Sequence, residues 1–222
     1  MDLSPLWISC KIAFSATLIT FVLGILCAWA VGTTRRARPF LDALLSLPLV
    51  LPPTVVGFFL LLLFSKNGGV GNFLFKFGVN PLFTWGGGVF AATVVSFPVM
   101  YRTARGAFGQ IDPSIIAAAR TLGLGEFWIF TRIMIPVSLP GIAAAVVLSF
   151  ARALGEFGAT IMVAGNLPGK TQTMAVAVYT AMQGGNKELA LKWVLIIFAL
   201  SAATLLLMNL ATERAAGRGG AR

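Results

Sequence analysis

The stretch AGNLPGKT, residues 164–171, has residue types and a spacing that could bind a nucleotide phosphate. It matches the phosphate-binding pattern G-x-x-x-x-G-K-[ST] except at the first position, where Ala164 replaces glycine. In a functional loop of this kind the backbone N–H groups and the lysine surround the phosphates, and the loop joins a strand to a helix. The elements on either side of residues 164–171 therefore decide whether this chain could bind ATP.

The composition indicates a membrane protein. Of the 222 residues, 58% are hydrophobic and 11% are charged, whereas soluble domains have roughly 45–50% and about 25%. The net charge of +10 does not come from a dense basic run, because the charged residues stand between long apolar runs. This distribution is typical of residues that orient a chain in a bilayer, and it argues against a nucleic-acid partner.

The chain lacks the side chains of a common metal site. It has no histidine, and its two cysteines, Cys10 and Cys27, lie on one apolar segment. On a helix these two residues would be about 25 Å apart, which excludes a disulfide. The usual zinc ligands cannot be assembled, and we expect this chain to bind no metal or cofactor.

Five segments are apolar enough to cross the hydrocarbon core, which takes about 20 residues in a helix. They cover residues 9–31, 43–64, 82–103, 137–163 and 192–211. The part of the fourth segment after Glu156 is too short to cross alone, so this segment is one long or broken helix. The sequence predicts a single all-α membrane domain over residues 1–222, with five spans rather than six.

Basic residues divide unequally between the two sets of loops that five spans create. The larger basic count belongs in the cytoplasm, which predicts an external N-terminus and a cytoplasmic C-terminus. The arginine-rich set comprises Arg35, Arg36, Arg38, Arg102, Arg105, Arg120, Arg132, Arg214, Arg218 and Arg222. The opposite set comprises Lys11, Lys66, Lys76, Lys170, Lys187 and Lys192.

This orientation places residues 164–192 away from the cytoplasm, where there is no ATP pool. The segment before the loop is a predicted membrane helix, whereas a phosphate-binding loop follows a strand. The match at residues 164–171 is therefore interpreted as a coincidence. Its Asn, Pro and Gly residues indicate a turn.

The cytoplasmic segment 106–136 carries signals for a short helix. Asp112 is a typical N-cap and Pro113 suits the first helical position, while Gly123 and Gly125 predict the end of the helix. A second short amphipathic piece follows. Taken alone, this segment fits an interfacial helix that lies on lipid headgroups.

The same segment resembles the cytoplasmic coupling motif of ABC importer permeases, which reads Glu-Ala-Ala, three residues, Gly, nine residues, Ile-x-Leu-Pro. Ala117 replaces the glutamate of this motif and Ile135 replaces its leucine. The matching positions are Ala118, Ala119, Gly123, Ile133 and Pro136.

This resemblance implies that the segment of residues 112–135 docks in a groove of a separate ATPase subunit and transmits its closure to the spans. ATP and Mg²⁺ would then be used by that partner, and this chain would not be an enzyme. Arg120 is a candidate for a polar contact with the ATPase. Its alternative role is a contact with lipid phosphate.

Three further stretches resemble permeases for molybdate, tungstate and sulfate. They are SLPLVLPPTVVGFFLLLLF (46–64) followed by GGVG (68–71), FARALGEFGAT (150–160) and ARTLGLG (119–125). The likeness covers nearly the whole chain, and the short five-span length is most similar to the molybdate branch. It implies a type I importer permease fold in a bacterial inner membrane, built as a homodimer with two ATPase subunits and one external molybdate-binding protein.

Other substrates and another class of transporter remain alternatives. Tungstate import cannot be ranked below molybdate import from this chain, and sulfate or thiosulfate import is the next alternative within the class. An ion-coupled secondary transporter would need inverted repeats and buried ionisable residues for its coupling ion. This chain shows no obvious repeat and one intramembrane pair of charges.

Two groups of residues are candidates for the translocation pathway. Pro48, Pro52 and Pro53 predict a break or kink in the second span, and Thr54 and Gly57 follow one turn later. Discontinuous helices often mark a substrate path, although a packing kink would explain the same residues.

Arg152 and Glu156 are the charged residues in the interior of a predicted span, at a spacing of i, i+4. This spacing puts them on one helix face, so they can pair with each other. Charges inside a span also commonly face a cavity. The alternative role is that Arg152 attracts a dianion while Glu156 restrains it.

Overall fold

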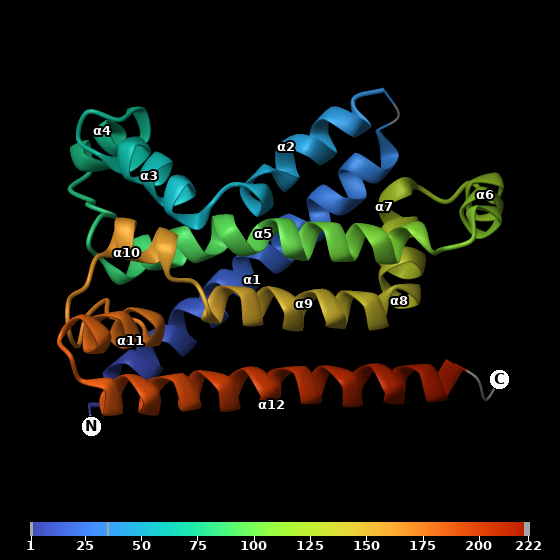
Figure 1. The fold of residues 1–222 in the computed structure, drawn as a ribbon. Helices are drawn as coiled ribbons and strands as arrows, with labels where there is room; N and C mark the ends of the chain where they lie inside the picture. The colour runs from blue at the N-terminus through green and yellow to red at the C-terminus, as the bar shows by residue number, and fades with distance from the viewer. Residues whose placement is uncertain (1, 35, 220–222) are drawn as a thin grey trace.

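The computed structural model describes residues 2–34 and 36–219, with side chains described as far as residue 209. Every regular element within these ranges is a helix (Figure 1), which confirms the predicted all-α fold class. Of the arginines assigned to the cytoplasmic side, Arg35 and Arg222 lie outside the described residues, and only the backbone is described at Arg214 and Arg218. The helices are α1 (Ser4–Thr33), α2 (Arg38–Val50), α3 (Pro53–Phe64), α4 (Gly69–Lys76), α5 (Trp85–Gly109), α6 (Pro113–Thr121), α7 (Glu126–Ile129), a π-helical segment (Phe130–Met134), α8 (Ile135–Val137), α9 (Leu139–Leu154), α10 (Gly158–Ala164), α11 (Met174–Gln183) and α12 (Lys187–Gly219).

Helix α5 is the centre of the bundle and packs against α1, α2, α9 and α10 (Figure 1). Small residues line its contacts, and Ala91, Ala92 and Ala104 have no exposed surface. On the facing helix α1, a Cβ at Gly24 would lie 2.6 Å from Cγ of Met100. Lipid tails are as apolar as the helix surfaces, so this close packing of small residues stabilises the bundle.

Two helices meet the length and hydropathy requirements of a membrane span on their own, α1 and the Lys187–Asn209 part of α12. Two bent pairs meet them jointly: α2 with α3, and Glu126–Val137 with α9. Helix α5, which begins in the predicted third span, is not among them. It also continues to Gly109, so Arg102 and Arg105 lie on a helix and not in the loop to which the sequence assigned them.

The second predicted span, residues 43–64, contains two helices whose axes differ in direction by 105°. Leu51 and Pro52, with ψ of 139° and 134°, are extended and separate α2 from α3. A proline disfavours the α conformation of the residue before it, and both Leu51 and Pro52 precede a proline. The break that these prolines predict is therefore present, whereas Pro48 lies inside α2 without ending it.

The fourth predicted span, residues 137–163, is also interrupted. Helix α9 ends at Leu154, α10 begins at Gly158, and Glu156 lies between them. The sequence left one long or broken helix open, and the structure has the broken form.

The two interrupted helices cross each other at glycines. A Cβ at Gly57 of α3 would lie 2.8 Å from Cα of Ala159 and 2.9 Å from Cβ of Met162, both on α10. A Cβ at Gly158 would in turn lie 3.0 Å from the backbone nitrogen of Thr54. Only glycine allows this approach of α3 and α10 without displacement of the backbone.

We predict that Gly57→Ala destabilises the protein, because the added methyl group forces α3 and α10 apart. Overpacking of this kind costs about 1–3 kcal/mol. The matched control is Gly32→Ala on α1, where a Cβ meets nothing within 4 Å. The midpoint of thermal unfolding in detergent should fall for Gly57→Ala and stay level or rise for Gly32→Ala. Equal midpoints would contradict the close packing of α3 on α10.

Candidate functional site

The segment between α5 and α9 contains the residues predicted to couple to an ATPase. Its first helix, α6, begins as the sequence predicts. The Asp112 carboxylate accepts a hydrogen bond of 2.8 Å from the backbone N–H of Ser114, and Pro113 occupies the first turn. Asp112 thereby satisfies an N–H group that has no partner within the helix.

The end of α6 is fixed by Gly123, whose φ of +77° places it in the left-handed region. Its N–H donates to the Arg120 carbonyl at 2.9 Å, and the N–H of Leu124 donates to the Ala119 carbonyl at 3.2 Å. These two bonds form a Schellman motif, which satisfies carbonyls that the helix end leaves free. A residue with a Cβ is strained at such a φ, so the glycine of the motif has a conformational role.

Arg120 and Glu126 connect the two sides of the turn at Gly123. The Arg120 Nε is 2.6 Å from Glu126 Oε1, and a second guanidinium nitrogen, Nη2, is 3.1 Å from Oε2. The guanidinium holds the pKa of the Glu126 carboxyl below its usual value, mainly through this hydrogen bonding. The side chains are 54% and 49% exposed, so the pair adds little stability but orients α7 relative to α6. Sequence reasoning considered Arg120 alone and missed Glu126, although opposite charges flank the turn.

The coupling segment (residues 112–135) contacts the rest of the bundle through aromatic side chains. The ring of Trp29 on α1 stacks on Phe130 with centroids 4.6 Å apart and meets the edge of Phe127 at 6.5 Å. Ile133 lies in the π-helical segment, and Pro136 follows in α8. Because Pro136 has no N–H to donate, it interrupts the regular hydrogen-bond ladder beside this segment.

The outer surface of the coupling segment is apolar and uncovered by the described part of the chain. Ile115, Leu122 and Phe127 expose 44%, 79% and 67% of their surface. Helix α6 projects from one end of the bundle (Figure 1). Ala118 is exposed on the same helix, whereas Ala119 is 4% exposed. An exposed apolar surface of this kind is typical of a protein contact.

Glu156 is a buried carboxylate with a partner on each oxygen. Its Oε2 lies 2.8 Å from Nη1 of Arg152, and its Oε1 accepts a 2.8 Å hydrogen bond from the backbone N–H of Ala159. The Glu156 side chain is 1% exposed, and that of Arg152 is 30% exposed. The pairing predicted from the i, i+4 spacing is present, and Glu156 also caps the first turn of α10, which sequence reasoning did not foresee.

The predicted pathway residues of α3 lie close to this pair. Pro53 and Thr54 approach Gly158, and Gly57 packs on α10. Pro52 and Thr54 are exposed. The structure thus brings the pathway candidates of α3 and the α9–α10 break together, and it places them away from α6 (Figure 1).

The stretch 164–171 forms a turn between two helices, α10 and α11. Gly165 and Gly169 both have φ of +72°. Thr171, which would bind Mg²⁺ in a phosphate-binding loop, is 1% exposed, and its hydroxyl accepts a 3.1 Å hydrogen bond from the Leu167 N–H. The strand that precedes a phosphate-binding loop is replaced by α10, in agreement with the interpretation of this stretch as a turn.

Comparison with known proteins decides the family. A sequence model described as the binding-protein-dependent transport system inner membrane component matches residues 20–216. The chain belongs to this family. It is therefore a multi-pass component of an inner membrane and is not itself an enzyme.

Two relatives of this inner membrane component match nearly end to end. The molybdenum transport system permease protein ModB of Escherichia coli (strain K12) is 43% identical over 215 residues, covering 94% of each chain. The protein of the same name from Haemophilus influenzae is 38% identical over 217 residues, covering 96% of this chain and 95% of its own.

A solved structure supports the fold of the family. A chain of a bacterial ABC transporter involved in the import of the acidic polysaccharide alginate superposes with a TM-score of 0.78. Its sequence is 18% identical, and the match covers 96% of this chain and 79% of that chain. The permease fold of type I ABC importers, which the sequence predicted, is confirmed.

We predict that Arg152→Gln destabilises the permease, because it leaves the Glu156 carboxylate buried beside a single backbone donor. The cost should be about 2 kcal/mol, below that of a fully buried pair because Arg152 is partly exposed. The control is Lys192→Gln, which removes the same charge from an exposed i, i+4 pair with Glu188 at 2.6 Å and should change little.

The double variant Arg152→Gln/Glu156→Gln completes this test. It removes the buried charge, so its midpoint of thermal unfolding should lie above that of Arg152→Gln alone. If Arg152→Gln and Lys192→Gln lower the midpoint equally, the ion pair does not have this stabilising role.

Proposed function

We propose that this permease is the transmembrane pathway subunit of an ATP-driven molybdate importer. The observation that carries the proposal is identity of 43% to a molybdenum transport permease over 94% of both chains. The fold of an ABC importer permease and the family of binding-protein-dependent transport components support the same function. An external binding protein would deliver the oxyanion, and a separate ATPase would use ATP and Mg²⁺.

The coupling segment is the proposed docking site for the ATPase. Its exposed apolar side chains, Ile115, Leu122 and Phe127, offer the surface that a groove of another subunit can bury. The Gly123 turn, the Arg120–Glu126 pair and the Trp29 stack keep this surface in a fixed relation to α1. The residues with this proposed coupling role are Ala118, Ala119, Arg120, Gly123, Ile133 and Pro136.

The assembly and orientation follow from the same role. Two copies of this chain would enclose one pathway, with two ATPase subunits on the cytoplasmic side and one binding protein outside. The N-terminus would be external and the C-terminus cytoplasmic. In support of this orientation, α6 lies toward the end of the bundle at which α12 finishes, away from the start of α1 (Figure 1).

The pathway is proposed to run along the exposed part of the α2–α3 break and the neighbouring end of α9. Pro52 and Thr54 are exposed there, and Arg152 is partly exposed and supplies positive charge. Pro53, Gly57 and Glu156 would not contact the oxyanion. They would shape the pathway because they hold α3 and α10 in place.

The function is tested by ATP hydrolysis in liposomes that contain this chain, its ATPase subunit and its binding protein. Molybdate-loaded binding protein should stimulate hydrolysis, with tungstate-loaded and sulfate-loaded forms as comparisons. Stimulation by the sulfate-loaded form alone would contradict molybdate import. A stable complex whose hydrolysis responds to no loaded form would contradict the importer function itself.

We predict that Gly123→Val uncouples hydrolysis from the loaded binding protein. At the Gly123 φ of +77°, the left-handed backbone conformation is less stable by about 1–2 kcal/mol for a residue with a Cβ. The cost for the β-branched valine is at least as large. Stimulation should fall by about fivefold to thirtyfold. The control is Gly125→Val, two residues away, where φ is −68° and ψ is 151° and where a Cβ also meets nothing within 4 Å. Equal stimulation in the two variants would contradict the conformational role of Gly123, provided that both complexes copurify with the ATPase.

A further inference from the structure

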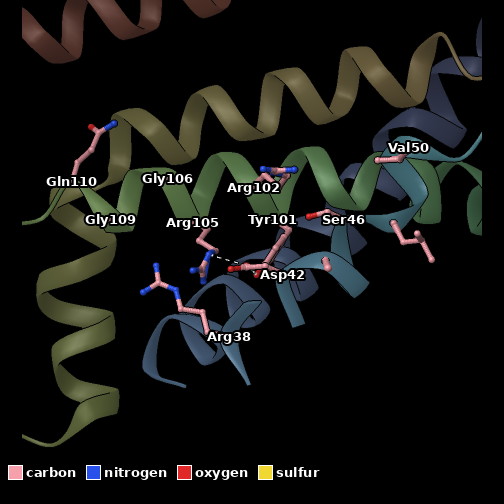
Figure 2. A pocket seen from close by; sticks show the side chains of 12 residues that line it. Arg38, Asp42, Ser46, Val50, Tyr101, Arg102, Arg105, Gly106, Gly109 and Gln110 are labelled. Carbon is pink, nitrogen blue, oxygen red and sulfur yellow. Dashed lines mark hydrogen bonds and ion pairs between the residues drawn. The ribbon is translucent and has the colours of Figure 1, made fainter. Parts of the chain in front are cut away.

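A cavity of about 760 Å³ lies between α2 and the C-terminal half of α5 (Figure 2). Its polar lining comes mainly from α2 and α5, which are far apart in the sequence. The residues that matter are Arg38, Asp42, Ser46, Tyr101, Arg102 and Arg105.

Asp42 is the acidic residue of this cavity, and two donors already occupy it. Its Oδ1 lies 3.0 Å from Nε of Arg105, and the same oxygen accepts a hydrogen bond from the Tyr101 hydroxyl. Tyr101 has no exposed surface. The Arg105 side chain reaches from α5 toward Asp42 on α2, as the dashed line in Figure 2 shows. Asp42 therefore orients Arg105 through one of its two carboxylate oxygens, and it is the acidic residue in the lining of this cavity.

The positive charge of the cavity exceeds what Asp42 can balance. Nη1 of Arg105 is buried and has no hydrogen-bond partner in the described part of the chain. Arg38 and Arg102 have no ion-pair or hydrogen-bond partner among the described residues either. Three arginines against one aspartate leave two positive charges in excess. A buried guanidinium N–H without a partner is uncommon, and it indicates a missing acceptor.

We propose that this cavity binds a tetrahedral oxyanion group at Arg38 and Arg105, with Arg102 adding positive charge at the edge of the cavity. Guanidinium groups match the oxygens of such anions with several charge-assisted hydrogen bonds. A dianion would balance the two excess charges. The occupant is either a free oxyanion, such as molybdate that has left the pathway, or the phosphate of a lipid headgroup, since both present the same oxygens. The cytoplasmic position of the site rests on the orientation in the proposed function.

The site also adjoins the coupling segment. A second cavity, of about 530 Å³, shares Arg38 and Arg105 with the first and extends to Arg120 and Glu126. An anion held by Arg38 and Arg105 would therefore lie between the helix bundle and the proposed ATPase-docking surface. This position links the site to the part of the chain that responds to the ATPase.

The test uses the complex of this chain with its ATPase subunit, without binding protein, in nanodiscs of phosphatidylcholine. Binding of molybdate and of inorganic phosphate is measured by calorimetry. The variant Arg38→Gln/Arg102→Gln should weaken binding about tenfold or more, because it removes a charged hydrogen bond from Arg38 and the positive charge of Arg102. Both side chains are exposed, so their loss should leave the fold intact. The control is Arg36→Gln, an exposed arginine nearby that does not line the cavity; it should bind as the wild type does.

A second arm distinguishes the two occupants. Nanodiscs that contain phosphatidylglycerol are examined by native mass spectrometry. An anionic lipid retained by the wild type and by Arg36→Gln, but lost in the double variant, identifies a headgroup as the occupant. The proposal is overturned if the wild type binds neither anion nor lipid, or if Arg36→Gln loses binding as much as the double variant does.

Uptake of molybdate by the full transporter, measured in parallel with binding protein present, separates this inference from the proposed function. Uptake without binding at the cavity contradicts the site alone. Binding at the cavity without uptake of any oxyanion contradicts the proposed function alone.

Discussion

Backbone N–H and C=O groups inside a bilayer have no water to bind, and each unsatisfied group costs several kcal/mol. This constraint governs the permease, because its chain interrupts two helices within the bundle. At the first interruption Pro52 and Pro53 have no N–H to satisfy, and the Pro52 carbonyl accepts hydrogen bonds from Val55 and Val56 at 2.9 and 3.2 Å. At the second, the Glu156 carboxylate accepts the N–H of Ala159, and Arg152 balances its charge. The chain can therefore change direction twice without leaving these groups unpaired.

Close packing of glycines then joins the two interruptions. Gly57 and Gly158 bring α3 and α10 into backbone contact, so the 105° turn and the α9–α10 break form one local structure. The coupling segment follows the same logic with different residues, because the Asp112 cap and the Gly123 turn satisfy both ends of α6. At each candidate site, nearby residues thus satisfy the backbone groups that a helix end or break leaves free. The central helix α5 packs against these regions and connects them.

Local signals explain how much of this arrangement the sequence could predict. Asp112, Pro113 and Gly123 predicted the limits of α6, the prolines predicted the break after α2, and the i, i+4 spacing predicted the Arg152–Glu156 pair. Contacts between distant residues could not be predicted in this way. The spacing of Asp42 and Arg105 in the sequence carries no signal that they pair, and the direction of α3 after the break depends on its packing against α10. Arg102 and Arg105 suggested a loop because charges usually end a span, but α5 continues to Gly109, with Arg102 exposed and Arg105 paired with Asp42 of α2.

The seven-residue length of α10 has a mechanical consequence. A helix this short is unstable in isolation and depends on its surroundings. Because α10 is held by the carboxylate of Glu156, by glycine contacts with α3 and by packing against α5, it cannot separate from α3 without losing contacts that stabilise it. The extended residues at 51–52 and the connection at 155–157 are the breaks at which the chain would bend if α3 and α10 moved as a unit. A movement at those breaks would leave the separation of α3 and α10 unchanged.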